Sequence, residues 1–78
     1  MEREEVFKKL NEIFEDVLDL EGVELNDASC ADDYDEWDSL ANIQLVIAIQ
    51  KAFNVKFNSA EILRWNNVGD MVDCILAK

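Results

Sequence analysis

The first segment of the chain alternates apolar and charged residues with the period of a helix. Apolar residues lie three or four positions apart, with Glu, Lys and Asp between them, and the apolar set is Val6, Phe7, Leu10, Ile13, Phe14, Val17 and Leu18. This pattern predicts an amphipathic helix over about residues 2–18, ended by Gly22 as the nearest helix breaker.

A long segment without helical period follows, from residue 19 to residue 38. Turn-forming residues at 26–29 and an acidic run at 32–36 predict a loop, and Val23 and Leu25 are expected to anchor it to the core. A structured loop of this length in a small domain is usually functional or disordered. The acidic loop is therefore a candidate functional segment.

The segment from Leu40 to Phe53 is apolar around most of a helical circumference. Such a helix is expected to be central, with neighbours packed on several sides. On a helical wheel of about 100° per residue, Gln44 and Lys51 mark the main polar stripe, and Ile47 lies beside it. We therefore expect Ile47 to be exposed or half-exposed.

Two further helices complete the chain. Asn58 followed by Glu61 resembles a capping box and predicts a brief third helix through about Arg64. A fourth helix opens at Asn66 or Asn67, and its apolar residues at 3.6 spacing are Val68, Met71, Val72, Ile75 and Leu76. With no strand pattern, residues 1–78 are expected to form a single all-α domain, a small four-helix bundle with a long first loop and a short third helix.

The charge of the chain is unevenly distributed. The formal net charge is −11, and residues 1–38 carry 15 acids against 3 bases, whereas residues 39–78 carry 3 acids against 4 bases. This balance argues against nucleic acid and anionic membranes as partners and favours a basic protein partner. No apolar run is long enough for membrane insertion, and the first residues lack a signal-peptide apolar region, so we expect a soluble cytoplasmic protein.

The side-chain inventory limits the chemistry open to the chain. It has no histidine, which excludes a His-based hydrolytic triad, and its two cysteines, Cys30 and Cys74, are too few for a disulfide framework or a Cys-based zinc site. We therefore expect no catalytic residues, no metal site and no enzymatic activity of the chain alone.

The boundary between the acidic loop and the central helix carries the main candidate site. Asp38 reads as a helix N-cap, which places Ser39 in the first turn, where unpaired N–H groups and the helix dipole favour an anion. A phosphate ester on the Ser39 hydroxyl would be stabilised there. The alternative is ordinary helix-start chemistry with nothing attached to Ser39.

The sequence resembles the acyl carrier protein family at this boundary and beyond it. The resemblance rests on Asp38-Ser39-Leu40, the run Ile43-Gln44-Leu45-Val46-Ile47-Ala48-Ile49 and Phe53, and the order of elements extends it over essentially the whole chain. It implies that Ser39 receives 4′-phosphopantetheine from coenzyme A and that acyl intermediates are held as thioesters on the arm. The implied partners of this monomeric carrier are a phosphopantetheinyl transferase and the acyl-loading and acyl-using enzymes of fatty-acid, lipid or polyketide-type synthesis.

The resemblance also assigns roles to neighbouring residues. Asp38 would cap the helix and, with Asp35 and Glu36, offer an acidic surface to partners. The remaining docking positions are Leu40, Gln44, Ile47 and Lys51, and the expected walls of an acyl pocket are Ile43, Val46, Ile62, Leu63 and Met71.

The chain departs from the family on the exposed side of the second helix. Fatty-acid-synthesis members are usually strongly acidic there, whereas the matching positions here are Ala41, Gln44, Gln50 and Lys51. This difference favours a specialised carrier that partners recognise mainly through the acidic loop. The alternatives are an aminoacyl or peptidyl carrier and, in a different class, an unmodified acidic helical adaptor.

Overall fold

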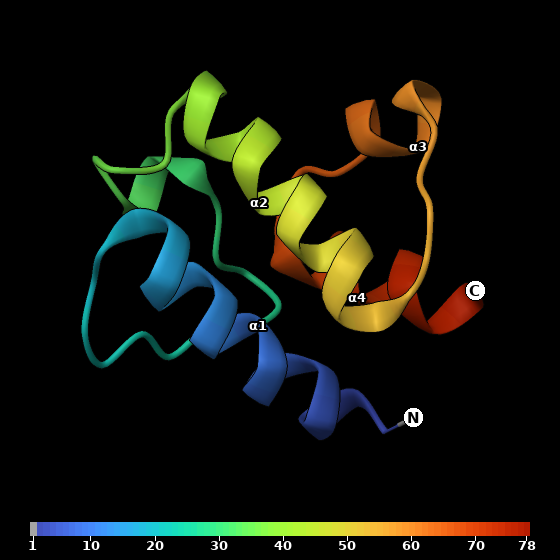
Figure 1. Ribbon diagram of the computed structural model, residues 1–78, viewed down its shortest axis with the longest axis horizontal. Helices are drawn as coiled ribbons and strands as arrows, with labels where there is room; N and C mark the ends of the chain where they lie inside the picture. The colour runs from blue at the N-terminus through green and yellow to red at the C-terminus, as the bar shows by residue number, and fades with distance from the viewer. Residues whose placement is uncertain (1) are drawn as a thin grey trace.

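The computed structural model describes residues 2–78, within which the regular secondary structure is helical and no strand occurs. The elements are α1 (Arg3–Leu18), the 3-10 turn η1 (Ala31–Asp33), α2 (Ser39–Phe53), α3 (Ser59–Leu63) and α4 (Val68–Ala77). Figure 1 shows α2 alongside α1, with α4 behind α2 and the short α3 at one end of the molecule. The predicted all-α bundle with a long first loop and a short third helix is confirmed.

Left-handed residues end the two long helices. Asp19 follows α1 with φ 55° and donates its N–H to the Glu15 carbonyl, and Asn54 follows α2 with φ 54°. Asp and Asn tolerate this conformation better than most residues with a side chain. The prediction that Gly22 ends the first helix is therefore wrong, because Asp19 ends it, although Gly22 has φ 70° within the loop.

The core lies between α1, α2, α4 and the long loop. It includes Val23 and Leu25 of the loop, as predicted, because the loop turns these two side chains inward. The other buried members are Val6, Leu10, Phe14 and Leu18 of α1, Leu45 and Ile49 of α2, and Val68, Met71, Val72 and Ile75 of α4. α3 contributes no buried residue, so the bundle is in effect three helices and a loop.

The central helix is less enclosed than its composition predicted. Within α2 only Leu45, Val46 and Ile49 are buried, whereas Ile43 and Ile47 are exposed. The expectation of neighbours on several sides was wrong, because α3 has only five residues and leaves the outer face of α2 uncovered. The predicted exposure of Ile47 is confirmed. None of the helices within residues 2–78 is long and apolar enough to span a membrane.

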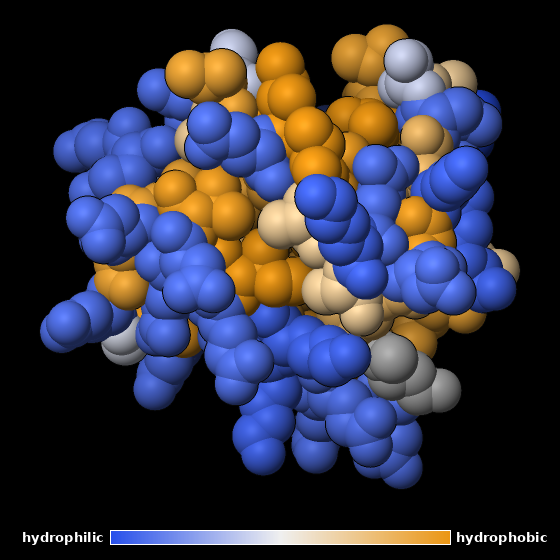
Figure 2. Space-filling view, in the orientation of Figure 1, coloured by the Kyte–Doolittle hydropathy of each residue, from blue (hydrophilic) through white to orange (hydrophobic). Residues whose placement is uncertain are grey.

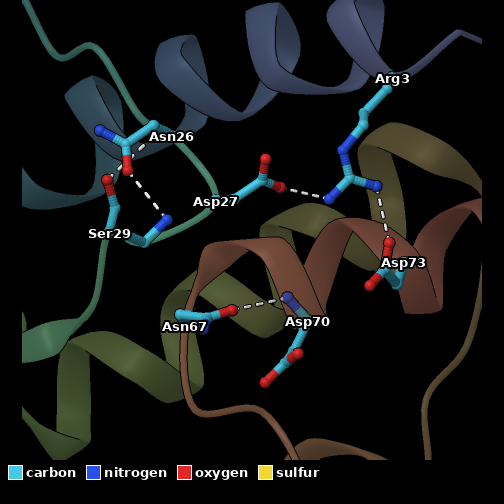
Figure 3. Close-up of polar contacts among 8 residues, drawn as sticks. Arg3, Asn26, Asp27, Ser29, Asn67, Asp70 and Asp73 are labelled. Atoms are coloured by element: carbon cyan, nitrogen blue, oxygen red, sulfur yellow. Dashed lines mark hydrogen bonds and ion pairs between the residues drawn. The ribbon is translucent and has the colours of Figure 1, made fainter.

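The long loop is fastened to the start of α4 by backbone hydrogen bonds. The N–H of Val68 donates to the Ser29 carbonyl at 2.7 Å, and the N–H of Gly69 donates to the Asp27 carbonyl at 3.1 Å. The Asn67 side chain accepts the N–H of the third helical residue at 2.9 Å (Figure 3). Loop and cap therefore supply the acceptors that the first turn of α4 lacks within the helix.

Arg3 links α1 to both partners of this junction. Its guanidinium forms ion pairs with Asp27 of the loop and with Asp73 of α4, the second at 2.6 Å (Figure 3). The hydrogen bonds with Asp27 and Asp73 raise the pKa of Arg3 above its ordinary value. All three side chains are exposed enough for water to screen the pairs, so they orient the loop more than they stabilise the fold.

α3 is held against the rest of the protein by polar contacts, because it contributes no buried apolar residue. Asn58 and Glu61 form the predicted capping box, and Glu61 also pairs with Lys78 at 2.8 Å and accepts a hydrogen bond from Cys74 at 3.2 Å. The Lys78 contact, the Asn58 N–H and the Cys74 thiol together lower the pKa of Glu61 to about 2. Burial, with Glu61 adding to it, raises the pKa of the Cys74 thiol.

Candidate functional site

Ser39 is the first residue of α2, and its side chain is exposed. Asp38 before it is extended and accepts the Ala41 N–H through its carboxylate at 2.8 Å, while its carbonyl accepts the Asn42 N–H at 2.8 Å. The predicted N-cap is confirmed. The N–H groups of Ser39 and Leu40, at the first two helical positions, have no carbonyl acceptor within the helix. An anionic group on the Ser39 hydroxyl would meet these donors and the positive end of the helix dipole.

A hollow of about 460 Å³ opens beside Ser39. Two regions that are distant in the sequence form it: residues 30–42, from the loop at η1 to the start of α2, and residues 62–71, from α3 to the start of α4. The lining residues are Cys30, Ala31, Trp37, Asp38, Ser39, Asn42, Ile62, Trp65, Asn66, Asn67 and Met71. The hydrogen bonds between the loop and the start of α4 hold these two parts of the lining together.

Two half-buried tryptophans form much of the apolar wall. The Trp37 ring packs edge-on against Phe14 with centroids 4.9 Å apart, and its indole N–H donates to the Asn42 side chain at 3.0 Å. The Trp65 ring packs edge-on against Phe57, also at 4.9 Å. These contacts restrain both rings. Trp37 therefore fixes the backbone that leads directly into Asp38 and Ser39.

The residues expected to wall an acyl pocket are only partly brought together. Ile62 and Met71 line the hollow, and Val46 is buried but does not line it. Ile43 and Leu63 are 58% and 84% exposed and lie outside it, so their placement in an enclosed wall is corrected. The physical reason is the five-residue length of α3, whose last residue, Leu63, faces solvent.

Several lining residues were not named in advance as part of the site. Asn42, Asn66 and Asn67 belong to this group, and so do Cys30 and Ala31 of the loop. The helix-cap pattern at Asn66-Asn67 was visible in the sequence, but its approach to Ser39 depends on how the loop packs against α4. Trp37 offered the one local signal, since an aromatic residue directly before Asp-Ser must lie near the serine.

The residues expected to dock partners all lie at the surface. Leu40, Gln44, Ile47 and Lys51 are exposed along α2, and Asp35 and Glu36 are exposed in the loop before it. Figure 2 shows apolar side chains gathered on the upper part of the molecule, where Figure 1 draws α2, with hydrophilic side chains around them. Contact with a partner at these residues stays a prediction.

Comparison with known proteins gives consistent matches over nearly the whole chain. Residues 8–75 match the family described as "Phosphopantetheine attachment site". An acyl carrier protein of Clostridium acetobutylicum is 32% identical over 73 residues, which cover 92% of this chain and 94% of the relative. The solution NMR structure of a holo acyl carrier protein from Geobacter metallireducens superposes with a TM-score of 0.88 at 32% identity, covering 94% of this chain and 84% of that one.

Proposed function

Because this chain belongs to the acyl carrier protein family, we propose that Ser39 bears its covalently attached 4′-phosphopantetheine and that acyl intermediates are carried as thioesters on that arm. The observation that supports this proposal most directly is the exposed Ser39 at the first residue of α2, within the matched residues 8–75. The arm supplies the thiol when attached. The residues of the chain hold and orient it, and the reactions of the cargo belong to partner enzymes.

The surroundings of Ser39 fit a phosphodiester. The first-turn N–H groups of Ser39 and Leu40 offer donors, and the helix dipole favours a negative charge there by about 0.3–1 kcal/mol. The carboxylate of Asp38 is engaged by the Ala41 N–H. Asp38 therefore serves to set the start of the helix and the direction of the serine, and the transferase supplies the base that removes the Ser39 proton.

The hollow beside Ser39 supports a resting place for the arm or for the first part of its cargo. Its apolar lining comes from Trp37, Ile62, Trp65 and Met71, and a flexible methionine adapts to groups of different shape. Acyl chains of increasing length on the holo protein should shift the NMR signals of Ile62, Met71 and Val46 progressively. Shifts confined to residues around Ser39 for every chain length would remove this part of the proposal.

We place the carrier with dedicated partners in fatty-acid, lipid or polyketide-type synthesis. The exposed, neutral Gln44 and the absence of any acidic residue within α2 support this choice, since an acidic outer helix face is missing. The same neutral face, together with Trp37 before Asp38-Ser39, favours an aminoacyl or peptidyl carrier as the second candidate. Intact mass of the protein isolated from its own cell separates the two, because the mass added by the cargo distinguishes an aminoacyl or peptidyl group from a fatty or polyketide acyl chain.

The direct test is intact mass after incubation with a phosphopantetheinyl transferase and coenzyme A. We expect one phosphopantetheine addition on the wild-type chain and none on Ser39→Ala. Ser59→Ala is the matched control, because Ser59 is also an exposed first helical residue after a capping side chain, here Asn58, and it should still be loaded. An arm retained in Ser39→Ala contradicts the site, and no addition to the wild type favours the unmodified adaptor.

A further inference from the structure

The hollow beside Ser39 has polar side chains in its lining as well as an apolar wall. These polar residues are Asp38, Ser39, Asn42, Asn66 and Asn67. Asn42 and Asn67 are half-buried, so a group that enters the hollow displaces water from their amides. An amide that loses water without gaining another hydrogen-bond partner costs free energy. The chemistry of these amides therefore affects which groups the hollow accepts.

The indole of Trp37 determines which way the Asn42 amide faces. An indole nitrogen can only donate, so the Asn42 atom that lies 3.0 Å from it is the carbonyl oxygen. The amide nitrogen of Asn42 points away from the indole, and no hydrogen bond from it to a protein group is found within residues 2–78. The edge-on contact with Phe14 restrains the Trp37 ring. Asn42 therefore offers an oriented N–H donor about one helical turn after Ser39.

The Asn67 amide is oriented in the same way at the start of α4. Its oxygen accepts the backbone N–H of Asp70 at 2.9 Å, which leaves its nitrogen as a donor (Figure 3). Asn42 belongs to α2 and Asn67 caps α4, yet both line the same hollow. The hollow therefore has two amide donors whose orientation is set by other groups of the protein.

The charges around these amides narrow the class of acceptor. No lysine or arginine is among the lining residues, whereas Asp38 contributes a carboxylate. A carboxylate on the cargo would meet this like charge without a basic side chain to compensate it. The ammonium group of an aminoacyl cargo brings only donors and leaves the amide donors unpaired. A keto oxygen accepts a hydrogen bond and carries no charge, so it matches the lining best.

The apolar lining contributes affinity without this selectivity. Ile62, Met71 and the two indole rings favour any acyl chain in proportion to the apolar area that it buries. The amides of Asn42 and Asn67 make the distinction, because an alkyl chain leaves their N–H groups unpaired and an acceptor on the chain pairs them.

Resting on the proposed function, we propose that this hollow selects acyl groups that carry a neutral hydrogen-bond acceptor, such as a keto oxygen, over alkyl chains of the same length. The amide N–H groups of Asn42 and Asn67 donate to the acceptor, and Trp37 is a positioning residue that acts through Asn42. The cargo reaches the hollow when the arm on Ser39 folds back. The arm has acceptors of its own, its phosphate and its amide carbonyls, so the bare arm is measured as a separate sample.

The test compares two cargoes that differ only by a keto oxygen in place of a methylene group. A phosphopantetheinyl transferase loads the full-length apo protein from coenzyme A, butyryl coenzyme A or acetoacetyl coenzyme A. Because a cargo held in the hollow is shielded, the rate of thioester exchange with dithiothreitol is measured relative to that of the same acyl coenzyme A in solution. We expect acetoacetyl to be protected about twofold to tenfold more than butyryl, the range expected for one hydrogen bond. The side-chain NH2 signals of Asn42 and Asn67 should also shift more with acetoacetyl.

Single-atom variants separate the donors from the structural role of these amides. Asn42→Asp and Asn67→Asp exchange the amide nitrogen for oxygen but keep the acceptors for the Trp37 indole and the Asp70 N–H. Gln44→Glu is the matched control, because it makes the same exchange at an exposed position of α2 outside the hollow. The ratio of acetoacetyl to butyryl protection should fall toward one in both Asp variants and stay at the wild-type value in Gln44→Glu.

Three results overturn the inference. They are equal or weaker protection of acetoacetyl relative to butyryl, a ratio that is unchanged in both Asp variants, and amide shifts that are already complete with the bare arm, which would assign the donors to the arm. Attachment of the arm to Ser39 is measured first by intact mass. If Ser39 takes no arm, the proposed function fails and this inference fails with it. If Ser39 is loaded and one of the three results is found, the proposed function stands and selection of the cargo by the amides is wrong.

Discussion

Replacing Gly69 with alanine tests how the long loop is held against α4. A Cβ at this position would lie 2.9 Å from the Asp27 carbonyl oxygen and 3.0 Å and 3.1 Å from Oδ1 and Cβ of Asp27. Contacts this short force a shift, and the nearest atom is backbone. The loop must move away, which weakens the hydrogen bonds from Gly69 to Asp27 and from Val68 to Ser29.

The expected loss of stability follows from opposing terms. Overpacking of a tight site costs about 1–3 kcal/mol, and each weakened hydrogen bond contributes about 0.5–1.5 kcal/mol. Alanine gains up to about 1 kcal/mol in helix propensity over glycine. We expect Gly69→Ala to lower the free energy of unfolding by about 1–5 kcal/mol, and each kcal/mol lowers Tm by roughly 4–8 °C in a domain of this size.

The assay is urea unfolding followed by tryptophan fluorescence, with thermal unfolding by circular dichroism and amide NMR shifts. Gly22→Ala is the control, because Gly22 has a positive φ but nothing within 4 Å of an added Cβ. It should perturb signals near residue 22, whereas Gly69→Ala should perturb residues 27–29 and the start of α4. A Gly69→Ala variant as stable as the wild type, with unchanged signals at 27–29, would refute the close-approach reasoning.

Two further predictions concern single polar contacts. Asp38→Ala removes the acceptor for the Ala41 N–H and should lower the free energy of unfolding in urea by about 0.5–2 kcal/mol. Asp38→Asn keeps a capping oxygen and should lower it by less. Equal losses in the two variants would argue against the cap. The pKa of Glu61 is lowered to about 2, chiefly by Lys78 and then by the Asn58 N–H, so its stabilising contribution is fully present above its unfolded pKa of about 4.3 and is lost as pH falls through about 2. Glu61→Gln should therefore reduce the dependence of the urea midpoint on pH between pH 2 and 5. An unchanged slope of midpoint against pH would contradict the lowered pKa.

The junction of loop and α4 connects stability to the site. Asp27 and Ser29 accept the first N–H groups of α4, and the residues that follow them, Cys30 and Ala31, line the hollow beside Ser39. A change that loosens the junction therefore alters the wall facing the arm without touching Ser39. Gly69→Ala should accordingly change the NMR shifts that Met71 shows with acyl chains of different length. Loading of Ser39 with phosphopantetheine should stay close to that of the wild type.

Features that depend on nearby residues could be predicted from the amino-acid sequence. The helices and their caps at Asp38, Asn58 and Asn67 were predictable because each cap joins a side chain to an N–H three residues later. The candidate serine was predictable for the same reason, since its place in the first turn of α2 follows from Asp38. The inward turn of Val23 and Leu25 was also visible, as two apolar residues in a polar loop.

Which apolar side chains are covered depends on how the helices and the loop pack together. Ile43 and Leu63 have the composition of wall residues, but a five-residue α3 leaves them exposed. The approach of Asp27 to Gly69 joins positions 42 residues apart, and no local pattern encodes it. Burial and cavity shape arise from contacts between distant segments, so the lining of the hollow follows only from the packing of the helices and the loop.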